Sequence, residues 1–164
     1  MSVSLTLLEL LDYSDHERSK WRGWVAADPT RLDLAFQPGG RFPTMWSIVE
    51  HMFLVERRHL ARLAGSTPPE STAVAAGDWQ GLFEYANLVR ADLRQYVEGL
   101  DETEAREIFT FSIPSGTHSM SHRKLVAHIL LHETRHWAQV AHTARTAGLT
   151  PPGEHDLFFF PGMA

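Results

Sequence analysis

The spacing of apolar residues along the chain predicts four long helices. Apolar positions recur at intervals of three and four residues over 3–27, 44–64, 78–100 and 121–147, which is the spacing of one buried helix face. In the first segment these positions are Leu7, Leu8, Leu11, Trp21 and Val25, and in the third they are Leu82, Tyr85, Ala86, Val89, Leu93, Tyr96 and Val97. With no internal repeat and no linker between them, these segments predict an all-α four-helix bundle that forms a single domain over 1–164.

Residues with strong capping preferences mark the ends of these helices. Thr44 and Asp78 are suitable N-caps, because a side-chain oxygen can accept a hydrogen bond from the first helical turn. Gly65 and Gly148 follow the second and fourth helices, and a Pro-Pro pair comes shortly after each of them. These signals agree with the boundaries that the apolar spacing predicts.

Two segments outside the predicted helices are rich in aromatic residues. The sequence IFTFSIPSG, residues 108–116, is short, aromatic and β-branched, which predicts a strand or an extended connection. The C-terminal sequence GEHDLFFFPGMA contains three consecutive Phe residues, and such a run favours association when it is exposed. We expect this run to pack against the bundle or against a second subunit.

Composition narrows the classes of site and partner. The chain has a net charge of −5 and no basic stripe, which argues against nucleic acid as a partner. It lacks an apolar run of the roughly 20 residues that span a bilayer, and its first residues do not resemble a signal peptide. We therefore expect a cytoplasmic protein that does not associate with membranes. Because the chain has no Cys, a metal ion must be bound by His, Asp or Glu.

The sequence HETRHWAQVAH, residues 132–142, fits the HExxH signature of zinc proteases, and His142 stands where one protease clan has its third zinc ligand. In that clan a Gly allows the chain to turn back toward the metal, but the residues here continue a helix. On a continuous helix His142 lies about 15 Å along the axis from His132 and about 80° around it. These two residues cannot then bind one ion, so the protease interpretation is disfavoured.

The four-residue spacing of His128, His132 and His136 supports a different metal site. If Leu125 marks the centre of the buried face, His132 and His136 lie about 20° to either side of that centre, and His128 lies about 60° away. Two unpaired imidazoles in an apolar stripe would cost several kcal/mol, and binding one metal ion removes that cost. The alternative is a pair of core histidines that are hydrogen-bonded to backbone or carboxylate groups.

A third ligand must come from another helix, and the segment 44–64 offers two histidines. His51 lies at the edge of the apolar face, whereas His59 lies nearer its centre and two turns later. The residues alone leave this choice open. Four carboxylates are candidates for hydrogen bonds to the ligands: Glu50, Glu56, Glu98 and Glu133.

Three stretches of the chain resemble the DinB-like (DinB/YfiT) metal-binding helical-bundle superfamily. LLDYSDHERSKWRGWV resembles its first helix, MWSIVEHMFLVERRHLARL its second, and RKLVAHILLHETRHWAQVAHTARTAGLTPPGEHDLFFF its last helix and tail. The resemblance places the family's three metal ligands on His51, His132 and His136. His128 matches a common upstream histidine outside this triad.

The resemblance implies a bundle that is often dimeric, with zinc or nickel on three histidines and open positions for water or substrate. The characterised members of this family are mostly thiol-dependent transferases or isomerases that use a low-molecular-weight thiol, and some are described as hydrolases. Many members have no known reaction. The family often has Arg-Gly directly after the last ligand, where this chain has Trp137-Ala138. Arg58, Arg62 and Arg135 are candidates to replace that cation, and the alternative for each is a solvated surface residue.

Two functional hypotheses follow from the residues and the resemblance. The first is a metal-dependent enzyme, of the S-transferase or hydrolase type, that acts on a small-molecule substrate as a homodimer. The second is a non-catalytic metal-binding or stress-response dimer, which a fourth protein ligand such as His59 or His155 would favour. By analogy with HExxH, Glu133 is a candidate general base, but it lies about 100° around the helix from His132. That position favours a surface or interhelical salt bridge.

Overall fold

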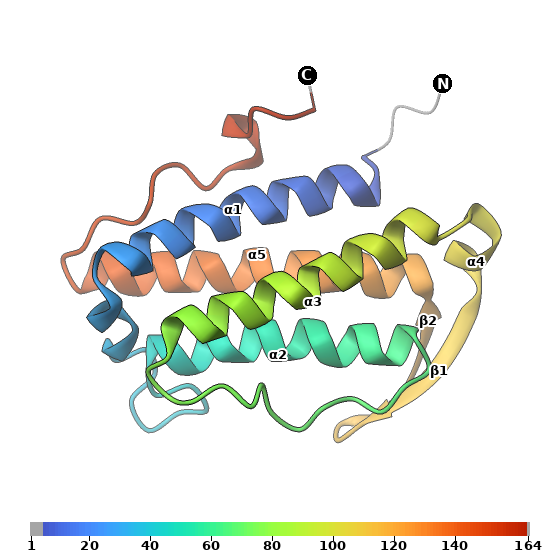
Figure 1. Ribbon diagram of the computed structural model, residues 1–164, viewed down its shortest axis with the longest axis horizontal. Coiled ribbons are helices and arrows are strands. Elements are labelled where there is room, and N and C mark those ends of the chain that lie inside the picture. The colour runs from blue at the N-terminus through green and yellow to red at the C-terminus, as the bar shows by residue number, and fades with distance from the viewer. Residues whose placement is uncertain (1–4, 164) are drawn as a thin grey trace.

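The computed structural model describes residues 5–163 and contains the four long helices that the apolar spacing predicts (Figure 1). They are α1 (Leu7–Ala27), α2 (Met45–Leu63), α3 (Trp79–Gly99) and α5 (His122–Thr146). The prediction of an all-α bundle is confirmed. The predicted start of the first helix, residues 3 and 4, lies outside the described residues.

The helix ends are formed by the predicted capping residues. The Thr44 side chain accepts a hydrogen bond from the backbone N–H of Ser47, whose hydroxyl accepts one from the Thr44 N–H in return. Asp78 accepts a hydrogen bond from the first turn of α3 in the same way. Gly65 and Gly148 follow α2 and α5 with φ values of +64° and +77°, a conformation in which glycine avoids a Cβ clash.

The order of packing around the bundle decides which side chains can meet. Both α1 and α2 pack against α3 and against α5, so α1 and α2 occupy opposite corners (Figure 1). The connection between them runs through a 3₁₀ turn, η1 (Pro29–Asp33), and an irregular loop. Because α2 packs beside α5, the histidines of the second and last long helices meet at one interface.

A β-hairpin and a short helix connect α3 to α5. Helix α4 (Glu102–Arg106) leads into β1 (Ile108–Ile113), which pairs antiparallel with β2 (Gly116–Ser121). The strand predicted within 108–116 is therefore confirmed as β1. Strand β2 was not predicted, because GTHSMS is mostly polar, has Thr117 as its one β-branched residue and contains no Phe, Trp or Tyr.

The bundle core has two apolar halves separated by a layer of charged side chains. Each long helix contributes one buried member of this layer: Arg18, Glu56, Arg90 and Glu133. One apolar half includes Trp21, Phe53 and Trp137, and the other includes Leu11, Leu93 and Leu130. The charged layer therefore crosses the middle of the bundle and links all four long helices.

The C-terminal segment lies along α1 and contains the 3₁₀ turn η2 (Leu157–Phe159) (Figure 1). Phe160 packs against Tyr13, with ring centroids 5.8 Å apart, as expected for a tail that folds back on the bundle. Phe158 and Phe159 remain 85% and 54% exposed. Their burial against a second subunit therefore stays a prediction. Within residues 5–163, no helix is long and apolar enough to cross a membrane.

Candidate metal centre

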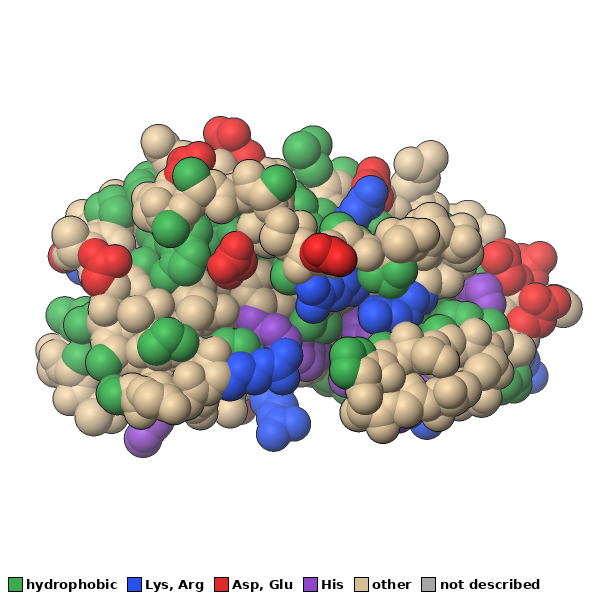
Figure 2. Space-filling view, turned by 90° about the horizontal axis from the view of Figure 1, so that it is seen from below, with side chains coloured by type: hydrophobic (Ala, Val, Ile, Leu, Met, Phe, Trp, Pro, Cys, Tyr) green, Lys and Arg blue, Asp and Glu red, His purple; other side chains and the backbone are tan. Residues whose placement is uncertain are grey.

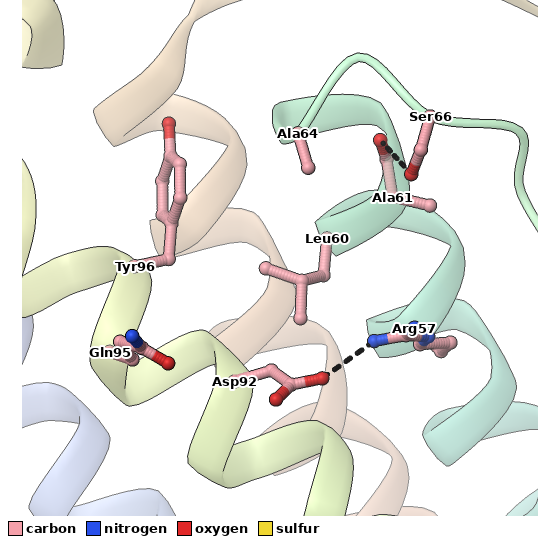
Figure 3. Close-up of a pocket in the computed structure, with 8 residues that line it drawn as sticks. All are labelled: Arg57, Leu60, Ala61, Ala64, Ser66, Asp92, Gln95 and Tyr96. Carbon is pink, nitrogen blue, oxygen red and sulfur yellow. Dashed lines mark hydrogen bonds and ion pairs between the residues drawn. The ribbon is translucent and has the colours of Figure 1, made fainter.

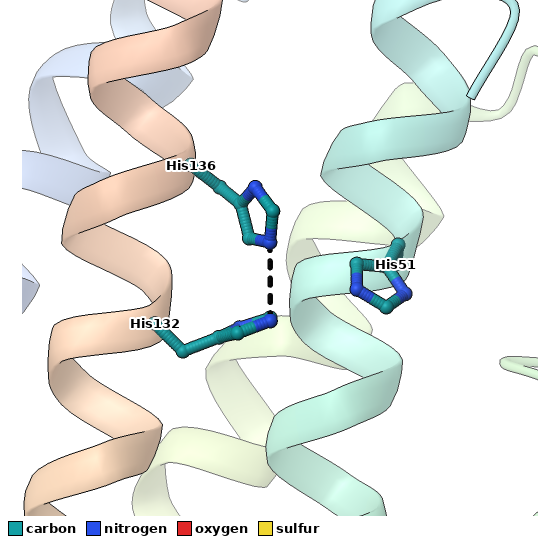
Figure 4. Close-up of side chains that lie close together, drawn as sticks. All are labelled: His51, His132 and His136. Carbon is teal, nitrogen blue, oxygen red and sulfur yellow. Dashed lines mark hydrogen bonds between the residues drawn. The ribbon is translucent and has the colours of Figure 1, made fainter. Parts of the chain in front are cut away.

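Three histidines meet at the interface between α2 and α5. His51 on α2 and His132 and His136 on α5 each offer a ring nitrogen, and these atoms all lie within 4.8 Å of one another (Figure 4). The Nε2 atoms of His132 and His136 are 3.1 Å apart. The structure therefore brings together the three residues on which the resemblance placed the metal ligands, in a group that can hold a metal ion.

The group lies at the flank of the buried face of α5, where the side chains are half-buried. The expectation that His132 and His136 occupy the centre of that face is wrong. The most buried side chains of α5 include Leu130, Glu133 and Trp137, which places the centre about 90° around the helix from Leu125. The prediction failed because Leu125 was taken as the centre of the face, whereas Glu133, about 80° around the helix from it, is buried in the charged layer of the core. The flank position leaves the three imidazoles nearer to solvent than a core position would.

The histidines of the group are in the protonation state that binds a metal ion at neutral pH. Burial lowers the pKa of His51 to about 4, and the nearby His136, Arg41 and Arg58 add to the effect. Burial lowers the pKa of His132 to about 3, with contributions from the neighbouring histidines. Both imidazoles are neutral near pH 7, so their nitrogen lone pairs are free of protons that a metal ion would have to displace.

Gln139 orients one of the three rings. Its Oε1 lies 2.6 Å from Nδ1 of His136, one helical turn earlier on α5, and accepts a hydrogen bond from the Nδ1–H. The proton on Nδ1 leaves the lone pair on Nε2, the atom that faces His132. Such an outer hydrogen bond to a metal-binding histidine is a regular feature of metal sites. Three imidazoles in this arrangement can hold a metal ion.

Three of the four carboxylates proposed as hydrogen-bond partners of the ligands have other partners in the described structure. Glu50 accepts a hydrogen bond from Thr72 at 2.8 Å, and Glu56 accepts one from Arg90 at 2.9 Å. Gln139 takes the orienting role instead. Its position three residues after His136 was visible in the sequence, but an amide was not considered for this role.

Glu133 is held by the charged layer. Its Oε1 accepts hydrogen bonds from Arg18 Nε at 2.9 Å and Trp137 Nε1 at 3.0 Å, and its Oε2 accepts them from Arg18, Arg90 and Ser14. Burial alone would raise the pKa of Glu133, but the two guanidinium groups lower it to about 2. Glu133 is an interhelical ion-pair residue, and these contacts occupy the oxygens that a general base would use.

Other histidines named in the sequence analysis lie outside the group. Helix α5 continues without a break through His142, which is exposed, so the third ligand of the protease motif is missing. His155, in the C-terminal segment, packs against α1, and its Nδ1 is 2.7 Å from Glu17 Oε2. His59 faces His128, with ring centroids 5.4 Å apart. Among residues 5–163, no fourth His, Asp or Glu joins the group.

Aromatic and cationic side chains surround the group. The Phe42 ring covers His51, with centroids 4.6 Å apart. Arg41, Arg58 and Arg135 lie close enough to lower the pKa of His51 or His136. Figure 2 shows histidine side chains within a hollow on this face, with Lys and Arg side chains beside them. The surroundings therefore favour an anionic molecule at the group.

Two of the arginines proposed to replace the family's cation have other partners. Arg58 donates hydrogen bonds to the backbone oxygens of Pro69 at 2.9 Å and Glu70 at 2.6 Å, which fixes its guanidinium beside α2. The Arg62 guanidinium lies over the Phe111 ring, 5.4 Å from its centroid, and 3.3 Å from His59. Arg58 contributes positive charge near His51 and Arg62 near His59, and neither is a freely solvated surface residue.

Comparison with known protein families gives a match to the model described as the DinB family, over residues 1–160. The matched range contains all four long helices and the three histidines of the group. No curated protein matches the chain with significance.

Proposed function

The chain belongs to the DinB family, and from this premise we propose that it is a metal-dependent enzyme whose zinc or nickel ion is bound by His51, His132 and His136. The proposed reaction is either transfer of a low-molecular-weight thiol to a small electrophile or hydrolysis of a small-molecule substrate. We further propose that the enzyme is cytoplasmic and acts as a homodimer.

The observation that carries this proposal is the open composition of the histidine group. Three imidazoles converge, and within residues 5–163 no further His, Asp or Glu completes the set. A structural metal site in a protein is usually closed by a fourth protein ligand, whereas a catalytic site keeps a position for water or substrate. His59 and His155, the two candidates for a fourth ligand, have other neighbours.

Each side chain around the group has a role in the proposed chemistry. A divalent ion bound here supplies Lewis acidity, which lowers the pKa of a water molecule or a thiol. Gln139 holds the His136 ring in the tautomer that leaves Nε2 free. Arg41 and Arg58 attract an anionic reactant and stabilise negative charge, and Phe42 covers one side of His51 and limits access of water.

The exposed coordination position can be tested with cobalt(II), which reports its ligands by visible and near-ultraviolet absorption. The chain has no Cys, so any thiolate-to-cobalt charge-transfer band must come from an added thiol. We expect titration of the cobalt-loaded protein with glutathione or cysteine to produce this band. The same titration in the His51→Ala variant should fail, because that variant lacks one of the three proposed ligands.

The outcome separates the two hypotheses. A thiolate band, or a change in the cobalt spectrum with pH that reports a bound water, supports an enzyme, and turnover of electrophiles with the thiol is then measured. A cobalt spectrum that responds to neither thiol nor pH would refute the enzyme proposal and favour a non-catalytic metal-binding protein. The His142→Ala variant is the matched control, since His142 lies on the same helix outside the group.

A further inference from the structure

A second cluster of histidines lines a cavity of about 240 Å³ beyond the metal-binding group. The cavity lies between the second half of α2, the β-hairpin and the first turns of α5. Most of its wall is apolar, formed by Phe111, Ile113, Met120 and Leu125. An engineered apolar cavity of about 150 Å³ binds benzene, so this space is large enough for a single ring with a substituent.

The cavity is connected to the three-histidine group by a row of imidazoles. His59 and His128 line the cavity and have ring centroids 5.4 Å apart. His128 in turn lies 5.7 Å from His132, centroid to centroid. A molecule in the cavity would therefore lie one imidazole away from the proposed metal ion.

One polar atom of the cavity wall needs a partner. His118 on β2 lines the cavity, and its Nε2 is buried without a hydrogen-bond partner in the part of the chain that the structure describes. A buried polar atom that remains unpaired destabilises a protein, so such atoms are usually satisfied by water or by a ligand. The position of His118 therefore points to a ligand with a polar group at this end of the cavity.

The charged residues around the cavity indicate the nature of the polar group of this ligand. Lys124 lines the cavity, and Arg62 lies beside it over the Phe111 ring. None of the described residues that line the cavity is acidic. A cationic rim without a carboxylate favours an anionic oxygen, which accepts a hydrogen bond from the His118 Nε2–H.

We propose that this cavity binds the substrate of the three-histidine site, and that the substrate is a small aromatic or branched aliphatic carboxylate. Its apolar body fills the space among Phe111, Ile113 and Leu125, and its carboxylate pairs with His118 and Lys124. The assignment as substrate rests on the proposed metal-dependent function, whereas binding to the cavity does not require the metal.

Binding is tested by fluorine NMR with 4-fluorobenzoate, on the full chain in metal-free and zinc-loaded forms. Fluorobenzene tests the ring alone, and trifluoroacetate tests the anion alone. Ile113→Trp fills the cavity, and Ser112→Trp is its matched control, because Ser112 is the neighbouring residue of β1 and is exposed. His118→Phe removes the proposed hydrogen bond and keeps a ring of similar size.

We expect saturable binding of 4-fluorobenzoate to metal-free protein, little change in Ser112→Trp and loss of binding in Ile113→Trp. His118→Phe should bind about tenfold more weakly, the effect of one hydrogen bond to a charged group. Ring resonances of His59, His118 and His128 should shift on binding. If Ile113→Trp fails to fold by circular dichroism, His118→Phe and these resonances provide the test.

Three results would overturn the proposal: no saturable binding in either form, equal binding of trifluoroacetate, or binding only to zinc-loaded protein that Ile113→Trp does not weaken. The last result would mean that the carboxylate binds the metal alone, which leaves the proposed function intact. If the protein takes up no metal but 4-fluorobenzoate still binds in the cavity, the proposed metal-dependent function is refuted and the binding of a carboxylate to the cavity stands.

Another cavity serves as an internal comparison. It has a volume of about 400 Å³ and lies between α2 and α3 (Figure 3). Arg57 and Asp92 form an ion pair across it at 2.8 Å, and no histidine lines it. A probe that occupied this cavity would leave the His59, His118 and His128 resonances unchanged, and that result would also contradict the proposal.

Discussion

Replacing Glu133 by Gln is predicted to destabilise the fold without removing the metal-binding group. Gln has nearly the same shape as Glu but carries no charge, so the substitution leaves Arg18 and Arg90 with less compensation. Both guanidinium groups are buried in the middle of the bundle. The neighbouring His132 is on a different face of α5 and keeps its surroundings.

The size of the effect follows from the contacts. Removing one member of a buried ion pair costs about 3–5 kcal/mol. Here Glu56 still faces both arginines, with its Oε1 2.9 Å from Arg90 Nε, and the Gln carbonyl can still accept one of the former hydrogen bonds. We therefore expect the lower end, a decrease of about 3 kcal/mol in the free energy of unfolding. For a chain of this length that corresponds to a decrease of about 6–12 °C in Tm.

The assay is urea unfolding followed by circular dichroism, with metal content measured on the same samples. Glu102→Gln is the control, because it breaks an exposed ion pair with Arg106 and should cost less than about 0.5 kcal/mol. A decrease below about 1 kcal/mol for Glu133→Gln would refute the reasoning about the charged layer. Loss of metal with unchanged stability would instead assign Glu133 to the site.

Two further predictions concern the histidines and their partners. Gln139→Leu should weaken zinc binding about 10- to 100-fold, because it removes the hydrogen bond that orients His136, while Gln139→Glu should retain most of the affinity. Competition with a chelating dye measures the zinc affinity of both variants. Equal affinity of the two variants would contradict the orienting role of Gln139. Burial lowers the pKa of His59 to about 3, and the nearby Arg62 and His128 add to this shift. Below about pH 6.5 His59 therefore binds a proton in the unfolded chain but stays neutral in the folded chain. The metal-free protein should therefore lose stability as the pH falls from about 6.5 toward 3, and His59→Phe should lose less; parallel pH dependence of the two proteins in urea unfolding would show that His59 is not responsible.

Much of the fold was predictable because its signals are local. Helix ends depend on Thr44, Asp78, Gly65 and Gly148, whose preferences act within one turn, and the apolar spacing decides which residues are helical. Strand β2 was missed because its stability comes from pairing with β1 and from packing on α5, and neither contact is visible in GTHSMS itself.

The site was predictable only in part for a similar reason. The four-residue spacing of His132 and His136 indicates a shared face, but the residues alone could not choose between His51 and His59, and the resemblance to a family made that choice. The orientation of α5 was predicted wrongly because Arg18 and Arg90, far away in sequence, neutralise Glu133 and allow its burial. The same long-range pairing shifts the histidines to the flank, where they are half-buried and nearer to solvent.

The most direct test of the account is the metal content of the purified protein, measured by elemental mass spectrometry on untagged protein prepared without a nickel column. We predict about one equivalent of zinc or nickel in the wild-type protein and in His142→Ala, and a loss of it in His51→Ala, His132→Ala and His136→Ala. If the wild-type protein binds neither zinc nor nickel even after reloading, or if His142→Ala loses the metal as the other three variants do, the three-histidine site is contradicted.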